Sequence, residues 1–262
     1  RPRLVARIAP ESRGREEDLR EALVLGLRDY TAKNGFEKVL LGLSGGIDSA
    51  LVAALAADAL GPERVECVSL PTRYNSAGTR DDAREVAESL GVGFREIAIE
   101  DLRLAFHAEL PESTGLAAEN LQARIRGVIL MTLSNQHGWL VLTTGNKSEV
   151  AVGYTTLYGD SCGGFAPIKD VPKLTVFALC RHLNAIAGRE RIPVSIIERP
   201  PSAELRDDQR DDQSLPPYEV LDPILDAYVE DDLSPGEIAA LGIAPLELAE
   251  RIARLVDRAE YK

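Results

Sequence analysis

Short apolar runs alternate with helical segments over the first 144 residues, and this alternation limits the possible folds more than any other feature of the sequence. Four runs have the length and composition of buried strands, at residues 38–43, 64–70, 93–99 and 139–144. The spacing of apolar residues around them predicts helices at 16–33, 48–60, 79–90, 101–109 and 117–137. Alternating strands and helices form βαβ units, so we expect an α/β fold, a doubly wound parallel sheet flanked by helices.

The strand signal ends after residue 144. We expect a helix at 173–187 and a helical C-terminal part from Tyr218 onward. Residues 71–80 and the Pro-, Asp- and Gln-rich segment 200–217 are expected to be mobile loops, and residues 1–14 a linker or arm. The chain starts at Arg1 and its one methionine is Met131, so we expect a processed chain or a piece of a longer protein.

The charge balance argues against some partners. The 262 residues include 30 Lys and Arg against 42 Asp and Glu, a net charge of −12. This excess of negative charge disfavours nucleic acid or an anionic membrane as the main partner. Three cysteines without CxxC spacing favour a reducing compartment, which we take to be the cytoplasm; Cys67 and Cys180 have the surroundings of small core residues, and the role of Cys162 is open.

The most specific local motif follows the first strand. Residues 38–43 lead into Ser44-Gly45-Gly46-Ile47-Asp48-Ser49, and a helix begins there. A glycine-rich turn at a helix N-terminus presents backbone N–H groups to an anion, most naturally a phosphate. Asp48 would repel a bare phosphate, so its expected role is to hold a magnesium ion that bridges to the phosphate.

Other phosphate-binding and nucleophile motifs fit this loop less well. A Walker loop would need a lysine, and a dinucleotide fingerprint would need GxGxxG. Gly42-Leu43-Ser44-Gly45-Gly46 does match GxSxG, the nucleophile elbow of α/β-hydrolases, which would make Ser44 a nucleophile. Only one expected strand precedes the motif and no HGGG-like segment lies upstream, so a serine hydrolase is kept as an alternative, beside a glycine-rich turn without function.

Further polar residues are expected to gather near this loop. Thr144 ends a strand, as Ser44 follows one, and ligands of open α/β sheets bind at the carboxyl ends of strands. Glu149 is placed to be a second metal carboxylate, or else an ordinary acid in the first turn of a helix. On helix 117–137, Asn120 and Arg124 are four residues apart and share a face, whereas Arg126 is expected to point elsewhere.

Two later segments suit a nucleotide. Aromatic and small polar residues interleave with glycine over 153–160, which favours a flat ring and ribose hydroxyls. Lys173 stands at an expected helix start, where the helix dipole disfavours a cation. A bound polyphosphate would offset that cost.

Together these motifs carry a family resemblance. SGGIDS after an apolar strand resembles the loop of the PP-loop ATP pyrophosphatase superfamily, whose members adenylate a carboxylate or carbonyl and release pyrophosphate. The stretches LGLSGGIDSALVAALA, AENLQARIRG, TTGNKSEVAVGYTTLYGD, PIKDVPK, ERPPSAEL and SLPPYEVLD resemble NAD⁺ synthetases, in particular the synthetase domain of the glutamine-dependent type. The resemblance runs from about Glu16 to the end of the chain.

The resemblance implies an adenine nucleotide α-hydrolase-like fold for residues 15–262 and a ligase that amidates deamido-NAD with ATP, magnesium and ammonia. In that family a glutaminase domain supplies the ammonia, so we expect the full-length protein to carry one before this fragment. A homodimer or higher homo-oligomer is also implied. Alternatives are another PP-loop adenylating amidotransferase, a tRNA-modifying member, which the net charge disfavours, and a non-enzymatic nucleotide-binding module.

The implied roles attach to individual residues. The ATP site is expected to comprise Gly42, Leu43, Ser44, Gly45, Gly46, Ile47, Asp48, Ser49, Thr144, Lys173 and Ser202. The deamido-NAD site is expected to comprise Asn120, Arg124, Glu149, Tyr158, Asp160 and Lys262. Asp48 and Lys173 are the expected catalytic residues, and Asp48 and Glu149 the expected magnesium ligands. The acidic stretch 204–213 departs from the usual pattern of the family, so the resemblance gives it no role.

Overall fold

A parallel sheet of four strands forms the centre of the molecule. The computed structural model describes residues 14–207, 209 and 213–262. The strands are β1 (Val39–Gly42), β2 (Val65–Ser69), β3 (Gly93–Glu96) and β4 (Leu140–Leu142), in the order β3-β2-β1-β4. Leu41 lies opposite Cys67 on one side and Leu142 on the other. The expected strands and their parallel pairing are confirmed.

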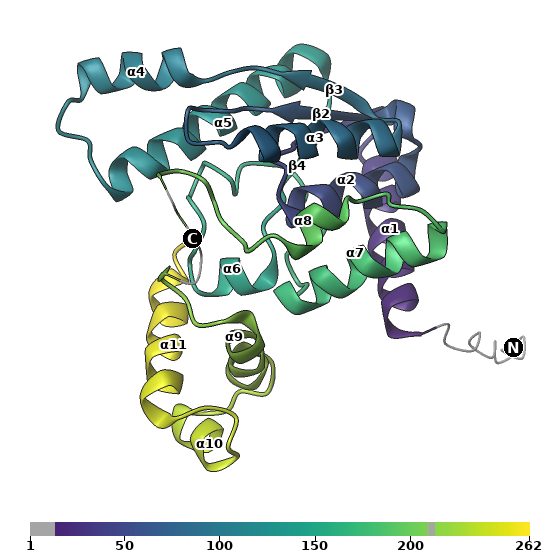
Figure 1. Ribbon diagram of the computed structural model, residues 1–262. Helices are drawn as coiled ribbons and strands as arrows, with labels where there is room; N and C mark the ends of the chain where they lie inside the picture. Colours follow the sequence, from purple (N-terminus) through teal and green to yellow (C-terminus); the bar gives the residue numbers. More distant parts are fainter. Residues whose placement is uncertain (1–13, 208, 210–212) are drawn as a thin grey trace, which may run out of the picture.

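The helices around the sheet match the expected segments closely (Figure 1). They are α1 (Arg15–Lys33), α2 (Ile47–Leu60), α3 (Ala77–Leu90), α4 (Glu100–Glu109), α5 (Leu116–His137), α6 (Lys147–Ala151), α7 (Lys173–Ala187), α8 (Val194–Glu198), α9 (Tyr218–Leu225), α10 (Pro235–Ala240) and α11 (Leu246–Ala259). A 3₁₀ turn, η1 (Pro62–Arg64), precedes β2, and a π-helical turn, η3 (Asp226–Glu230), follows α9. The five-residue helix α8 was not predicted, because it is too short to show a helical period. The equally short α6 was foreseen only in the alternative that Glu149 is a first-turn acid, and Glu149 does lie in its first turn.

The third and fourth strands are shorter than expected. The third, β3, ends at Glu96 rather than at residue 99, and β4 covers Leu140–Leu142 rather than 139–144. The backbone nevertheless stays extended beside the end of β2, because the amides of Ile97 and Ile99 donate to the carbonyls of Ser69 and Pro71 at 2.9 and 3.0 Å.

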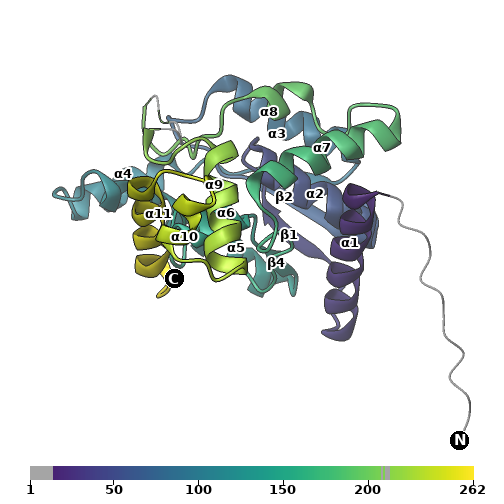
Figure 2. The same ribbon diagram turned by 90° about the horizontal axis from the view of Figure 1, so that it is seen from below.

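Both faces of the sheet are covered, which explains the unbroken apolar runs of its strands. Leu41 points into a core shared with α1, α2, α3 and α7, whereas the neighbouring Leu40 points into a second core with α5. Figure 2 shows the sheet between these two groups of helices. Helix α2 is buried on nearly every side, so its N-terminal loop is held rigidly at the end of β1.

The C-terminal part is helical, as the sequence predicts, and its helices form a third core of their own. Helices α9, α10 and α11 pack together below the sheet in Figure 1 and meet α6 through Val152. Pro235 opens α10 beside a capping box made by Ser234 and Glu237. None of the helices in the described part of the chain is both long and apolar enough to cross a lipid bilayer.

A network of charges joins α1 to α2 and α7 and yields a prediction on acid stability. Glu17 accepts hydrogen bonds from Arg20 at 2.6 Å and pairs with His182 at 2.7 Å. The bond from Arg20, and then that from His182, lower the pKa of Glu17 from 4.5 to about 2. A lowered pKa in the folded state stabilises the protein above the ordinary pKa and loses that effect as pH falls from 4.5 towards 2.

We therefore expect Glu17→Gln to lower the free energy of unfolding by about 1 kcal/mol at neutral pH. Urea unfolding at several pH values should show this difference from wild type shrinking below pH 4.5. Asp29→Asn is the control, because Asp29 pairs with Lys33 on the exposed surface of the same helix and should change stability little. A difference for Glu17→Gln that stays constant down to low pH would contradict the assigned pKa.

Candidate functional site

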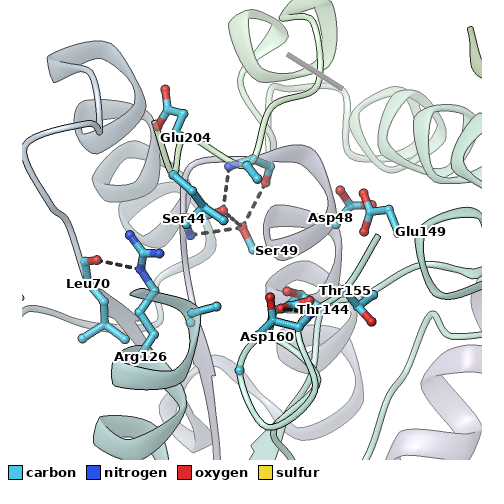
Figure 3. A pocket seen from close by; sticks show the side chains of 18 of the residues that line it. Ser44, Asp48, Ser49, Leu70, Arg126, Thr144, Glu149, Thr155, Asp160 and Glu204 are labelled. Carbon is cyan, nitrogen blue, oxygen red and sulfur yellow. Dashed lines mark hydrogen bonds between the residues drawn. The ribbon is translucent and has the colours of Figure 1, made fainter. Parts of the chain in front are cut away.

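A cavity of about 560 Å³ opens at the carboxyl ends of β1, β2 and β4. This is the edge at which ligands of open α/β sheets bind. Its wall combines the loop before α2, the inward face of α5, the loop after β4, the start of α7 and residues 199–205 (Figure 3). The tertiary structure thus brings together segments that are far apart in the sequence.

The loop between β1 and α2 is held in a fixed shape by its own hydroxyl groups. Ser49 Oγ donates to the carbonyl of Gly46 at 3.0 Å and accepts from the amide of Ser44 at 3.2 Å. Ser44 Oγ accepts from the amide of Gly46 at 3.1 Å. Gly46 is the N-cap of α2 and supplies no capping side chain. Residues 46–49 line the cavity, so the positive end of the helix dipole lies at its wall.

Gly45 cannot be replaced in this loop without a rearrangement. Its φ of +83° lies in the left-handed region. A Cβ atom at this position would stand 2.1 Å from the carbonyl oxygen of Thr79 at the start of α3. The glycine therefore allows both the turn and the close approach of α3.

A buried lysine joins the two expected metal ligands. Lys173 Nζ lies 2.5 Å from Asp48 Oδ2 and 2.9 Å from Glu149 Oε1, and the lysine is only 2% exposed. Figure 3 shows Asp48 and Glu149 side by side. Burial alone would lower the pKa of Lys173, but the charges of the two carboxylates outweigh burial and raise it. Asn146 fixes Asp48 by donating to Oδ1 at 2.8 Å.

Side chains from other segments cap the start of α7. Ser148 Oγ accepts from the amide of Lys173 at 2.9 Å, and Asp222 accepts from the amide of Leu174 at 2.8 Å. Because Asp48 and Glu149 lie beside the ammonium group, the cation at this helix start is already compensated within the protein. The polyphosphate proposed for that purpose from the sequence is not needed for it.

Helix α5 presents Asn120 and Arg124 to the cavity as expected. Asn120 Oδ1 accepts from Thr156 Oγ1 at 2.7 Å, and Arg124 Nε donates to the carbonyl of Leu157 at 3.3 Å. The expectation that Arg126 points elsewhere is wrong: it lines the same cavity and donates to the carbonyl of Leu70 at 3.0 Å. Burial lowers its pKa to about 10.

The error has a geometric cause. The two arginines flank the inward face of α5, around Ala123 and Gly127, from opposite sides, and an arginine side chain is long enough to reach in from either. Helical spacing places Cα atoms and does not show this reach.

The remaining expected residues differ in their placement. Thr144, Ser202, Asp160 and Lys262 line the cavity. Burial raises the pKa of Asp160, and Lys262 Nζ donates to the carbonyls of Gly153 and Thr155 at 2.5 and 2.7 Å. Tyr158 is 74% exposed and does not belong to the lining.

The lining also includes residues that were not singled out in the sequence, among them the charged Arg80, Glu119, Arg199 and Glu204. Glu204 accepts from Thr79 Oγ1 at 2.7 Å and from Asn75 Nδ2 at 3.0 Å, so it joins the segment 200–205 to the start of α3. The stretch ERPPSAEL carries Arg199 and Glu204 and was the available signal. Part of the expected loop 200–217 lies outside the described residues, and its mobility stays a prediction.

Charged side chains of both signs line the cavity, although the chain is acidic overall. Among the described residues, the lining combines six cationic side chains with five carboxylates: Arg80, Arg124, Arg126, Lys173, Arg199 and Lys262 against Asp48, Glu119, Glu149, Asp160 and Glu204. The cations suit a ligand with several phosphates. No histidine is among the lining residues, so Ser44 has no histidine to act as its base, and the GxSxG hydrolase reading is not favoured.

This fold and this site define a nucleotide-binding α/β domain of the PP-loop type. The comparisons narrow the class: a family model described as NAD synthase matches residues 19–262. The chain belongs to the NAD synthase family.

Individual relatives agree with this assignment. A glutamine-dependent NAD(+) synthetase from Thermotoga maritima is 51% identical over 256 residues, which are 95% of this chain and 44% of the relative. A solved glutamine-dependent NAD⁺ synthetase from Acinetobacter baumannii, in complex with ADP, has a TM-score of 0.71 and 45% identity, over 98% of this chain and 47% of the other. An NMN synthetase from Francisella tularensis has a TM-score of 0.80 and 28% identity, over 95% of both chains. The chain thus spans less than half the length of the curated relatives it matches.

Proposed function

We propose that this chain amidates deamido-NAD to NAD⁺ with ATP and ammonia, through an adenylated intermediate, and releases AMP and pyrophosphate. The observation that carries the proposal is the buried Lys173, which meets the SGGIDS loop and Glu149 in one cation-lined cavity. Membership of the NAD synthase family supports it. The proposed substrate and the proposed reaction both rest on the contacts of Lys173 and on the family membership.

Magnesium fits the residues present. Asp48 and Glu149 offer hard oxygen ligands, and within the described residues no group of three or more His, Cys, Asp or Glu could hold a metal by itself. Mg²⁺ is commonly bound by one or two carboxylates together with substrate phosphates. When bound here, it would neutralise phosphate charge.

The chemistry requires activation of the carboxylate, because oxide is too poor a leaving group for ammonia to displace. An oxygen of the nicotinate carboxylate attacks the α-phosphorus of ATP, and the bond to the pyrophosphate oxygen breaks. The lone pair of ammonia then attacks the adenylated carbonyl carbon. AMP leaves, and the attacking nitrogen loses a proton. The first amides of α2 and Lys173 would hold the departing pyrophosphate, and Asn120, Arg124 and Asp160 the substrate, which positions the reacting groups without a nucleophilic side chain.

The longer, glutamine-dependent relatives support a proposal for the nitrogen source. We infer that a glutaminase domain supplies ammonia in the full-length protein, which acts in the cytoplasm, and that this chain uses free ammonia. The test is a coupled assay with ATP, Mg²⁺, deamido-NAD and ammonium that reads AMP and NAD⁺ together. Equal amounts of both are expected. AMP without NAD⁺ would indicate another acceptor, and a parallel reaction with nicotinate mononucleotide tests amidation of the mononucleotide.

We also propose that the chain forms a homodimer through α4. This helix projects from the sheet in Figure 1, and together with the following loop and the start of α5 it exposes large apolar side chains. They are 45–71% exposed and comprise Leu102, Leu104, Phe106, Leu110 and Leu116, here called the α4 patch. Several exposed large apolar side chains on one projecting segment are typical of an interface.

Replacing Phe106 by glutamate should convert the dimer to a monomer, because the charge would have to be buried without a partner. Light scattering coupled to size-exclusion chromatography measures the mass. The control is Leu241→Glu, an apolar residue that is 66% exposed on a different surface. Equal masses for wild type and Phe106→Glu would rule out α4 as the interface.

A further inference from the structure

One cation already bridges the two carboxylates proposed to bind magnesium. Lys173 Nζ contacts Asp48 Oδ2 at 2.5 Å and Glu149 Oε1 at 2.9 Å. Mg²⁺ binds oxygen at about 2.0–2.1 Å, so an ion that bridges the same two oxygens would lie very close to Nζ, and two cations so close together repel each other strongly. The lysine and the metal cannot both hold this position.

The lysine is well fixed there. Its backbone amide donates to Ser148 Oγ at 2.9 Å, and the ring of Tyr218 lies 5.5 Å from Nζ on another side. Asp48 is itself fixed by Asn146. The carboxylates are 17% and 18% exposed, so removing the lysine would leave two charges of like sign poorly solvated.

A bound phosphate can draw Lys173 away from the two carboxylates. Asp48 belongs to the SGGIDS loop, so a phosphate bound by that loop would lie close to Nζ. The ammonium group could then pair with the phosphate, and the two carboxylates would become ligands for a divalent cation. Each negative group keeps a positive partner throughout this exchange.

We propose that Lys173 competes with the divalent cation for Asp48 and Glu149, so that the metal binds appreciably only when a polyphosphate takes over the lysine. This rests on the proposed function, because it assumes that Mg²⁺ and ATP act at this site. The device would prevent the protein from binding free metal without nucleotide.

The test measures metal binding rather than activity. The probe is Mn²⁺, followed by electron paramagnetic resonance in the absence of nucleotide. Lys173→Met should bind Mn²⁺ at least about tenfold more tightly than wild type, because the competing cation is gone. The double variant Lys173→Met with Glu149→Gln should bind Mn²⁺ about 10–100-fold more weakly than Lys173→Met. Mg²⁺ should also raise the melting temperature of Lys173→Met more than that of wild type.

Lys147→Met is the matched control. Lys147 also bridges two acids, Asp226 at 2.8 Å and Glu230 at 2.9 Å, but it lies outside the cavity lining. Asp226 and Glu230 are 54% and 61% exposed, so water solvates them well and holds them less rigidly than Asp48 and Glu149. Removal of Lys147 should therefore change Mn²⁺ affinity little. Equal affinities for wild type and Lys173→Met would overturn the proposal.

Mn²⁺ binding to the wild-type chain is a second test, and it does not require that the Lys173→Met variant folds. Mn²⁺ alone should bind it only weakly, and tight binding at Asp48 and Glu149 without nucleotide would also overturn the proposal. The result is separable from the proposed function: a chain that makes NAD⁺ but shows no competition loses only this inference, and a chain that shows competition without making NAD⁺ loses only the function.

Discussion

Asp48→Asn should lower kcat for NAD⁺ formation by about 10³, an effect at the upper end of those seen when one preorganised electrostatic contact to a transition state is removed. Asp48 lies in the SGGIDS loop, contacts Lys173 at 2.5 Å and is a proposed magnesium ligand. Its neutral replacement keeps the size of the side chain and its bond with Asn146, but removes the charge that orients the lysine and the metal. Steady-state kinetics with saturating ATP and deamido-NAD measure the change.

The control uses a carboxylate with a similar lysine contact elsewhere. Asp226 pairs with Lys147 at 2.8 Å on the surface, so Asp226→Asn should leave kcat unchanged. Circular dichroism and thermal unfolding check that Asp48→Asn is folded. A folded Asp48→Asn variant with near-normal kcat would exclude Asp48 from the reaction.

Gly45→Ala should raise the KM for ATP by about 100-fold or abolish activity, which corresponds to about 2.7 kcal/mol of lost binding. The added Cβ would lie 2.1 Å from the carbonyl oxygen of Thr79, and that oxygen is backbone and cannot rotate away. Either the loop or α3 must move, and the amides of the loop then lose their direction towards the phosphate.

Gly35→Ala separates the collision from the backbone strain. Gly35 also has a positive φ, +73°, but nothing lies within 4 Å of the position of its Cβ. This control should cost about 1 kcal/mol of stability and leave the KM for ATP unchanged. Equal KM values for the two glycine variants would show that the contact with Thr79 does not matter.

Strong local signals in the sequence determined the architecture. Apolar runs such as 38–43 are buried on both faces of the sheet, and a strand buried on both faces must be apolar at every position. Capping residues and glycines predicted the helix ends, because capping side chains bond the unpaired backbone groups there and glycine adopts the left-handed conformation that ends a helix. The SGGIDS loop, Thr144 and Glu149 could be placed at one edge because parallel strands end on the same side of a sheet.

The tertiary structure alone decided how side chains meet. The sequence shows Lys173, Asp48 and Glu149 as separate candidates, while their direct contact depends on the packing of α7 against α2 and on the position of α6. The same holds for Arg126, whose long side chain reaches the cavity from the flank of α5, and for Glu204, which bridges to Thr79 over 125 positions of sequence. Helical and strand periods define the direction of a Cβ atom within one element, whereas a contact between elements depends on their relative placement and on side-chain torsions, which no local period encodes.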